Sequence, residues 1–183
     1  MTIFTFNEQQ SIGEVRSVET SRITIRVTDG QRLQKARVGR LVAIQATGDE
    51  WLIGIVERVW RHPVELPTLD EGEVAEGAAA IQQEENGVAI SLVGTFRARD
   101  GQRHNTFSRA VFALPEINRP VYPIEEKSLE DFMGILSASS KADAATPLKV
   151  GTYTLDGKAS AYIDGDKLFQ RHAALLGSTG SGK

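Results

Sequence analysis

The sequence predicts a mainly β fold, in which a small N-terminal β-barrel is followed by a helix and then by the first strands of an α/β unit. Three observations support this prediction. Short runs of apolar and β-branched residues fill the first hundred positions, separated by Gly and Asp. One amphipathic helical pattern follows near residue 130, and an apolar run then leads into a glycine-rich stretch. Short strands separated by turn residues are typical of small barrels.

Five strands are expected in the barrel. The clearest covers residues 22–28, where Ile23, Ile25 and Val27 alternate with polar residues, the period of a strand with one wet face. Asp29-Gly30 after it is interpreted as a turn. The other four runs cover residues 12–18, 38–45, 51–60 and 88–96. No helical pattern is expected between these strands.

The strand at residues 51–56 is apolar on both faces, with Trp51, Ile53 and Ile55 on one side and Leu52 and Val56 on the other. A small barrel has a filled interior and a wet exterior. The second apolar face therefore needs a cover, either another segment of the chain or another subunit. We expect a subunit seam at or beside this strand.

Two stretches carry charge of one sign. Residues 65–86 contain seven acids and no base, typical of a solvated insertion or of a docking surface for a basic partner. Residues 97–109 are basic around Asp100-Gly101 and predict a hairpin tip that could contact phosphate, pair with an acidic loop or simply aid solubility. Its basic residues are Arg97, Arg99, Arg103, His104 and Arg109.

A helix is predicted to begin at Ser128, which could cap it, with Asp131 in the place of a capping-box acid. Apolar residues then recur at helical spacing, and this stripe indicates packing: Leu129, Phe132, Met133 and Leu136. Residues 137–147 resemble a linker, and residues 148–155 and 159–163 form two strands joined at Asp156-Gly157. The expected domains are the barrel at 1–122, the helix and linker at 123–147, and the α/β unit at 148–183.

Composition excludes several classes of protein. The chain has no cysteine, hence no disulfide or thiolate metal site, and its net charge of −3 gives no global nucleic-acid signature. Its histidines, His62, His104 and His172, lie far apart and predict no metal site. The N-terminus has no signal-peptide pattern, and no apolar run approaches the ~20 residues of a membrane helix. A soluble, cytoplasmic protein is expected.

The final seven residues carry the most specific signal. They follow the pattern G-x-x-x-x-G-K of a phosphate-binding loop: Gly177, Ser178, Thr179, Gly180, Ser181, Gly182 and Lys183. Glycines let backbone N–H groups point at an anion, while the lysine reaches the outer phosphates. The apolar residues 173–176 supply the strand that should precede such a loop. The alternative is a flexible Gly/Ser tail.

Four stretches together resemble the N-terminal third of the HerA family of hexameric ATPases, and the resemblance covers nearly the whole chain. They are "IGEVRSVETSRITIRV", "VGRLVAIQ" with "WLIGIVERV", "FSRAVFALPEINRPVY" and "LFQRHAALLGSTGSGK". The last, which is similar to the family's entry into its Walker A loop, is the specific one. In the third, Arg109 is followed by Ala110 where the family tends to have glycine.

The resemblance implies a HAS barrel for assembly and effector docking, followed by the start of a RecA-like core that uses ATP and Mg²⁺. It implies a hexameric ring that acts on DNA as a translocase or helicase, with a nuclease or sirtuin-type effector, in DNA end processing or anti-phage defence. Lys183 would be the catalytic lysine, and residues 177–183 would bind nucleotide. The magnesium ligand and the remaining catalytic residues would lie beyond Lys183, so we expect a truncated chain that hydrolyses no ATP by itself.

Two other interpretations of the sequence remain open. A stand-alone OB-like module would bind single-stranded nucleic acid through exposed aromatic residues on a basic groove, whereas only 7% of these residues are aromatic. An unrelated P-loop enzyme would place its loop after the first strand of a domain, whereas this loop begins at Gly177.

Overall fold

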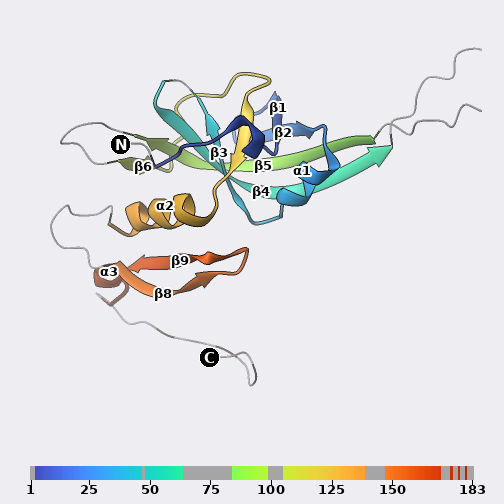
Figure 1. The fold of residues 1–183 in the computed structure, drawn as a ribbon. Helices are drawn as coiled ribbons and strands as arrows, with labels where there is room; N and C mark the ends of the chain where they lie inside the picture. The colour runs from blue at the N-terminus through green and yellow to red at the C-terminus, as the bar shows by residue number, and fades with distance from the viewer. Residues whose placement is uncertain are drawn as a thin grey trace, which may run out of the picture. The chain divides into compact units, whose positions relative to one another are not determined.

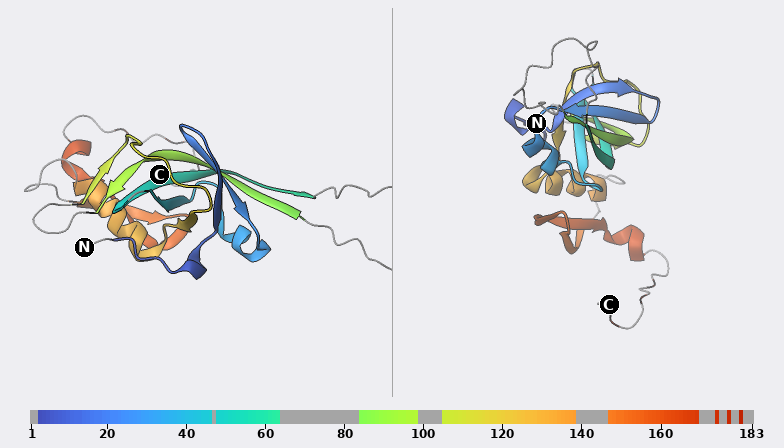
Figure 2. Two further views of the ribbon diagram at one scale, coloured as in Figure 1. Left: turned by 90° about the horizontal axis from the view of Figure 1, so that it is seen from above. Right: turned by 90° about the vertical axis from the view of Figure 1, so that its right-hand side faces the viewer.

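The computed structural model describes residues 3–46, 48–63, 84–98, 105–138 and 147–169, together with Ala174, Gly177 and Gly180. The chain divides into two compact units (Figures 1 and 2). The first, called the barrel unit here, comprises Thr5–Phe96 and Ser108–Ile124. The second, the hairpin unit, comprises Met1–Phe4, Arg97–Phe107 and Glu125–Lys183. Each unit is described by itself below.

One sheet holds seven strands. They are β1 (Gly13–Val18), β2 (Arg22–Val27), β3 (Leu41–Gln45), β4 (Glu50–Pro63), β5 (Glu84–Arg97), β6 (Thr106–Ser108) and β7 (Pro120–Pro123). Their order is β2-β1-β7-β3-β4-β5-β6, and β2 also pairs with β5. Six strands therefore close into a barrel, and β6 extends the sheet from β5. The mainly β fold with a small barrel is confirmed (Figure 1).

The closing pair is antiparallel and regular. Arg22 lies opposite Ser91 and Val27 opposite Asn86, with each residue between them paired in turn. Ile23, Ile25 and Val27 all face the interior, as the alternation in β2 predicts. A single cluster of buried aliphatic side chains fills that interior. Its members are Ile12, Val15, Ile23, Ile25, Val27, Ala36, Val42, Ile44, Ala46, Leu52, Val56, Val88, Ile90 and Val121.

A short helix, α1 (Gly30–Lys35), stands where the sequence predicts only a turn and no helix. Asp29 is its N-cap, because its carboxylate accepts a hydrogen bond from the Gln31 N–H at 2.8 Å. An Asp-Gly pair suits a hairpin turn, but aspartate is equally good as a helix cap. The residues that follow, Gln31 to Lys35, are good helix formers, and they decide in favour of the helix.

Residues 51–56 of β4 are apolar on both faces, and both faces are covered. Leu52 and Val56 belong to the interior cluster, while Ile53, on the opposite face, is also fully buried. Ile53 pairs with Ala43 of β3, which in turn pairs with Tyr122 of β7, so these residues form one row across the outer face.

The N-terminal segment of the same chain supplies part of the outer cover. Phe6 stacks on Tyr122 with ring centroids 4.7 Å apart, and it meets Trp51 edge-on at 5.4 Å. The sequence left two covers open for this face, another segment of the chain or another subunit. The structure shows the first, because Phe6 packs on this face and Ile53 is buried, and the subunit seam stays a prediction.

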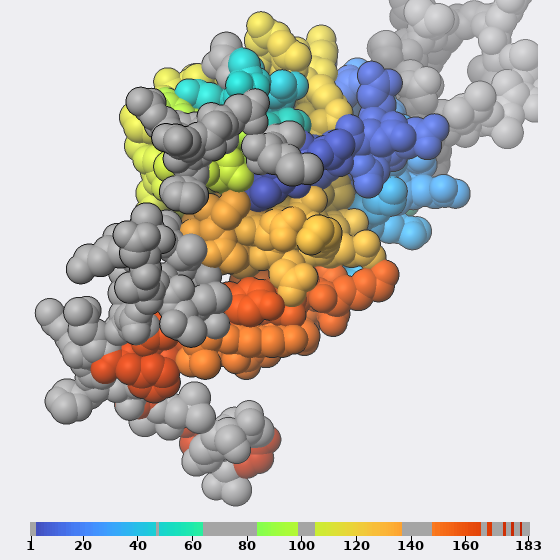
Figure 3. All heavy atoms as spheres, turned by 60° about the vertical axis from the view of Figure 1, so that its left-hand side comes forward, coloured from blue at the N-terminus to red at the C-terminus, as the bar shows by residue number. Residues whose placement is uncertain are grey.

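The hairpin unit contains α2 (Glu126–Ala138), β8 (Pro147–Tyr153), β9 (Asp156–Asp164) and α3 (Gly165–Phe169). β8 and β9 form an antiparallel pair, and α2 packs on β9. Figure 3 shows α2 in gold lying against the orange and red hairpin. The predicted apolar stripe is confirmed as packing, since Phe132 is buried with ring centroids 6.1 Å from Phe4 and 5.5 Å from Phe107.

Candidate functional site

The candidate phosphate-binding loop spans residues 177–183, and the structure describes two of them. Gly180 has φ of 83°, a left-handed backbone that favours glycine, and a side-chain carbon built there would meet nothing within 4 Å. Gly177 and Gly180 are both exposed. These properties fit a loop whose backbone is free to face an anion. Ser178, Thr179, Ser181, Gly182 and Lys183 lie outside the described residues, as does all of the predicted strand at 173–176 except Ala174.

The described lead-in to this loop is the β8–β9 hairpin. Leu148 lies opposite Ile163, and Thr152 opposite Ser160. α3 then follows β9 directly and ends at Phe169. The two strands predicted at 148–155 and 159–163 are thus confirmed as neighbours in one hairpin. The hairpin and α3 precede the candidate loop in the sequence.

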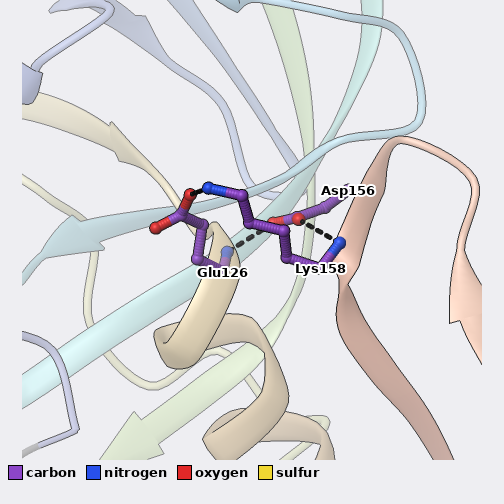
Figure 4. A network of polar contacts seen from close by, with 3 residues as sticks. All are labelled: Glu126, Asp156 and Lys158. Atoms are coloured by element: carbon purple, nitrogen blue, oxygen red, sulfur yellow. Dashed lines mark hydrogen bonds and ion pairs between the residues drawn. The ribbon is translucent and has the colours of Figure 1, made fainter.

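A polar network joins the start of α2 to the turn of this hairpin (Figure 4). The Asp156 carboxylate accepts hydrogen bonds from the backbone N–H of Glu126 and, at 3.2 Å, from that of Lys158. The Lys158 Nζ in turn donates to Glu126 Oε1 at 2.6 Å. Asp156 thereby satisfies a backbone donor at the N-terminus of α2 from the other side of the hairpin unit, and its negative charge suits that helix end.

The sequence-predicted cap of α2 is wrong. The helix begins at Glu126 rather than Ser128, and the Ser128 hydroxyl donates to the Ile3 carbonyl at 3.4 Å. Asp131 lies inside the helix, 3.6 Å from Lys127 in an ion pair one turn away. No local pattern could identify Asp156, since the cap and the helix start are separated by the whole of α2 and β8.

The lysine of this network is a surface group. The hydrogen bond and the charge of Glu126 raise the pKa of Lys158 above its usual value of 10.5. Its side chain is 79% exposed, however, and that of Glu126 is 60% exposed, so water and salt screen most of the attraction. The network is therefore a structural link between α2 and the hairpin.

The acidic and basic runs are described only at their ends. Glu84, Glu85 and Asn86 belong to β5 rather than to a loop, and Glu84 lies 3.3 Å from Arg61 in an ion pair. The rest of the acidic run falls outside the described residues. In the basic run, Arg97 ends β5 and Arg109 is exposed after β6; Arg99, Arg103 and His104 are likewise outside.

The described residues contain neither a group of three or more His, Cys, Asp or Glu side chains that could hold a metal ion, nor a helix long and apolar enough to cross a membrane. Of the three histidines, His62 is exposed at the end of β4. The sequence analysis did not single out one cationic segment, in and after α1. It contains Arg32, Lys35, Arg37 and Arg40.

Comparison with known proteins bears on the segment that contains the hairpin and the glycine-rich loop. No curated protein matches the chain in sequence. Residues 148–183 match a family model described as "Helicase HerA, central domain". This match starts at β8, runs through β9 and α3, and includes every residue of the candidate loop. The C-terminal segment of the chain is therefore similar to the central domain of the helicase HerA, and in the sequence it follows a closed six-stranded barrel.

Proposed function

We propose that this chain is the N-terminal part of a HerA-like ATP-dependent DNA translocase or helicase, with the barrel as its assembly and effector-docking module. The observation that carries the proposal is the match of residues 148–183 to the HerA central domain, in the same segment that holds the GSTGSGK loop. The closed barrel that precedes this segment supports it, because a small barrel before the motor is the order that the resemblance implies.

The division of labour follows the expected domains. We propose that residues 1–122 carry the assembly role of the barrel, residues 123–147 the helix and linker, and residues 148–183 the start of the ATPase core. In the loop, backbone N–H groups around Gly180 and Gly182 would hold the phosphates of ATP, and Lys183 would neutralise their charge. Hydrolysis also needs bound Mg²⁺ and an oriented water. The proposal therefore requires the full protein to continue beyond Lys183 and to supply those groups.

A surface of the barrel unit supports the docking role. Three large apolar side chains lie exposed between β6 and β7: Phe112 at 62%, Leu114 at 53% and Ile117 at 53%. Exposed apolar residues gathered in one segment are typical of protein interaction sites. We infer that a hexameric ring places such surfaces where an effector, a nuclease or a sirtuin-type enzyme, can bind, in DNA end processing or anti-phage defence.

The test uses the protein extended past Lys183 by its natural sequence. We expect DNA-stimulated release of phosphate from ATP, measured with malachite green, and a hexamer by size exclusion with light scattering. Lys183→Ala should abolish phosphate release and leave both the oligomer and the far-UV circular dichroism unchanged, since the lysine acts on phosphate. Activity that survives in Lys183→Ala, or a stable monomer, would contradict the proposal.

A further inference from the structure

The segment that begins with α1 is cationic without interruption. Between Asp29 and Asp49 the sequence has four basic residues and no acid, although the whole chain has a net charge of −3. The four are Arg32, Lys35, Arg37 and Arg40. Arg32 and Lys35 are three positions apart on α1, a spacing that puts two side chains on the same side of a helix. The charge is therefore gathered at one place on the barrel unit.

The backbone under these side chains is fixed to the barrel. Ala36 belongs to the interior cluster, and Leu33 packs against that cluster. The turn after α1 is bonded to β4 in both directions: the Gly39 N–H donates to the Val56 carbonyl at 2.8 Å, and the Val56 N–H donates to the Arg40 carbonyl at 2.9 Å.

Arg40 makes hydrogen bonds within the turn that follows α1. Its guanidinium donates from Nη1 to the Lys35 carbonyl at 3.0 Å, and its backbone N–H donates to the Arg37 carbonyl at 3.0 Å. The other three cations are thus presented from a backbone that is already held in place, so a ligand need order only their side chains.

Some other arginines of the barrel are paired with neighbouring acids. Arg22 lies 3.1 Å from Glu57, and Arg119 lies 2.7 Å from Glu116. Within the described ranges, Arg32, Lys35 and Arg37 have no such ion pair, and Lys35 and Arg37 are exposed. Their charge is therefore available to an external anion.

We propose that Arg32, Lys35 and Arg37 form a binding surface for the phosphate backbone of nucleic acid. Guanidinium groups suit phosphate because they can donate two parallel hydrogen bonds to it. The surface offers little to a protein partner: among the described residues from 30 to 46, Val38, at 59%, is the one large apolar side chain that is exposed. Protein interfaces depend on apolar and aromatic anchors. The choice of DNA as the nucleic acid rests on the proposed function.

A surface of this kind has a measurable signature. Each phosphate contact releases condensed counterions, so the logarithm of the binding constant for duplex DNA falls with the logarithm of salt by about 0.9 per contact. Three contacts predict a slope of about −2.7, or roughly a 40-fold loss of affinity between about 50 and 200 mM salt. One remaining contact predicts only about a 3- to 4-fold loss over the same range.

The experiment measures fluorescence anisotropy of a labelled mixed-sequence DNA duplex titrated with the chain of residues 1–183, without nucleotide. The test variant is Lys35→Gln/Arg37→Gln. The matched control is Arg16→Gln/Lys149→Gln, which removes the same two residue types at exposed positions elsewhere. We expect the test variant to bind less tightly at low salt with a slope near −0.9, and the control to keep the parent's slope.

Three results would overturn the proposal. The first is no binding of the duplex by the parent chain at low salt. The second is an equal loss in test and control variants, which would mean diffuse attraction by net charge. The third is an unchanged DNA slope together with lost binding of polyglutamate, which would assign the surface to an acidic protein. Because these titrations contain no ATP, their failure leaves phosphate release by the extended protein as an independent test of the proposed function.

Discussion

Replacing Asp156 by alanine should weaken α2 specifically. The carboxylate accepts the Glu126 N–H at the start of the helix and the Lys158 N–H in its own turn. Loss of an N-cap acid typically costs about 1 kcal/mol, within a range of about 0.5–2 kcal/mol. Because Asp156 is the acceptor for two backbone donors, we expect about 1–2 kcal/mol for Asp156→Ala. Asp156→Asn keeps an acceptor oxygen and should lose only the part due to charge at the helix terminus.

The two units can be followed separately in urea. The only tryptophans, Trp51 and Trp60, both belong to the barrel unit, so their fluorescence reports the barrel, whereas ellipticity at 222 nm is dominated by helix. With urea m-values of about 1–3 kcal/mol/M, a loss of 1 kcal/mol lowers the midpoint by about 0.3–1 M. We expect this shift in the ellipticity curve.

Two controls decide between the cap in the structure and the cap that the local sequence suggests. Ser128→Ala and Asp131→Ala should each move the ellipticity midpoint less than Asp156→Ala does. Ser128 makes only a 3.4 Å bond to Ile3, and Asp131 pairs with Lys127 on an exposed helix surface. If Ser128→Ala or Asp131→Ala lowers the midpoint as much as Asp156→Ala, the reasoning from the Asp156 geometry is refuted.

Three further changes test the barrel, and a fourth, on α2, is a control for the first. Gly54→Ala should destabilise the barrel by about 1–3 kcal/mol, because the added carbon would collide with Ile90. Gly134→Ala, in open space on α2, should instead stabilise the protein by about 0.5–1 kcal/mol. Equal effects of the two substitutions in chemical denaturation would contradict this reasoning. Ile53→Lys should unfold the barrel, since its buried site has no partner for a charge, and a folded protein of smaller oligomeric size would support the subunit seam. Burial and the Glu8 carboxylate raise the pKa of Tyr122 above 10.0, so the folded state keeps a proton that the unfolded state loses; this contribution is complete below pH 10 and disappears as pH rises through the raised pKa. Tyr122→Phe should therefore lose less stability between about pH 9 and pH 11 in urea titrations than the parent, and parallel losses would show that the phenol is not responsible.

The sequence predicted five of the six barrel strands and missed β7, and periodicity worked best for β2, which has one buried face. Ile23 and Ile25 show the clearest alternation, and both are fully buried. The same signal could not give strand ends: β4 reaches Pro63 and β5 begins at Glu84, beyond the apolar parts of both strands. Polar residues such as Glu84 extend a strand through backbone pairing and an ion pair with Arg61, neither of which leaves a mark in hydropathy.

The errors arose where a residue's partner is distant in sequence. Asp156 caps α2, and Phe6 covers Tyr122, but neither contact follows from neighbours along the chain. The sequence did indicate that residues 51–56 need a second cover, and only the fold shows that the N-terminal segment contributes to it. Within the candidate site, the sequence predicted the glycine-rich loop and the two strands of the hairpin that precede it. The sequence analysis did not predict the cationic segment, because it interpreted Asp29-Gly30 as a turn. It therefore did not predict α1, on which Arg32 and Lys35 lie.

The pairing of β2 with β5 has a consequence for the speed of folding. It joins Arg22–Val27 to partners 59 to 69 positions away, whereas β1–β2 and β3–β4 join neighbours in the chain. Chains dominated by distant pairings fold slowly, because the entropy of closing a long loop is lost before its contacts form. Hairpin formation should therefore come early and barrel closure late. Until closure occurs, the edges of β2 and β5 carry unpaired backbone groups, and during that interval the nascent protein is most exposed to association with other chains.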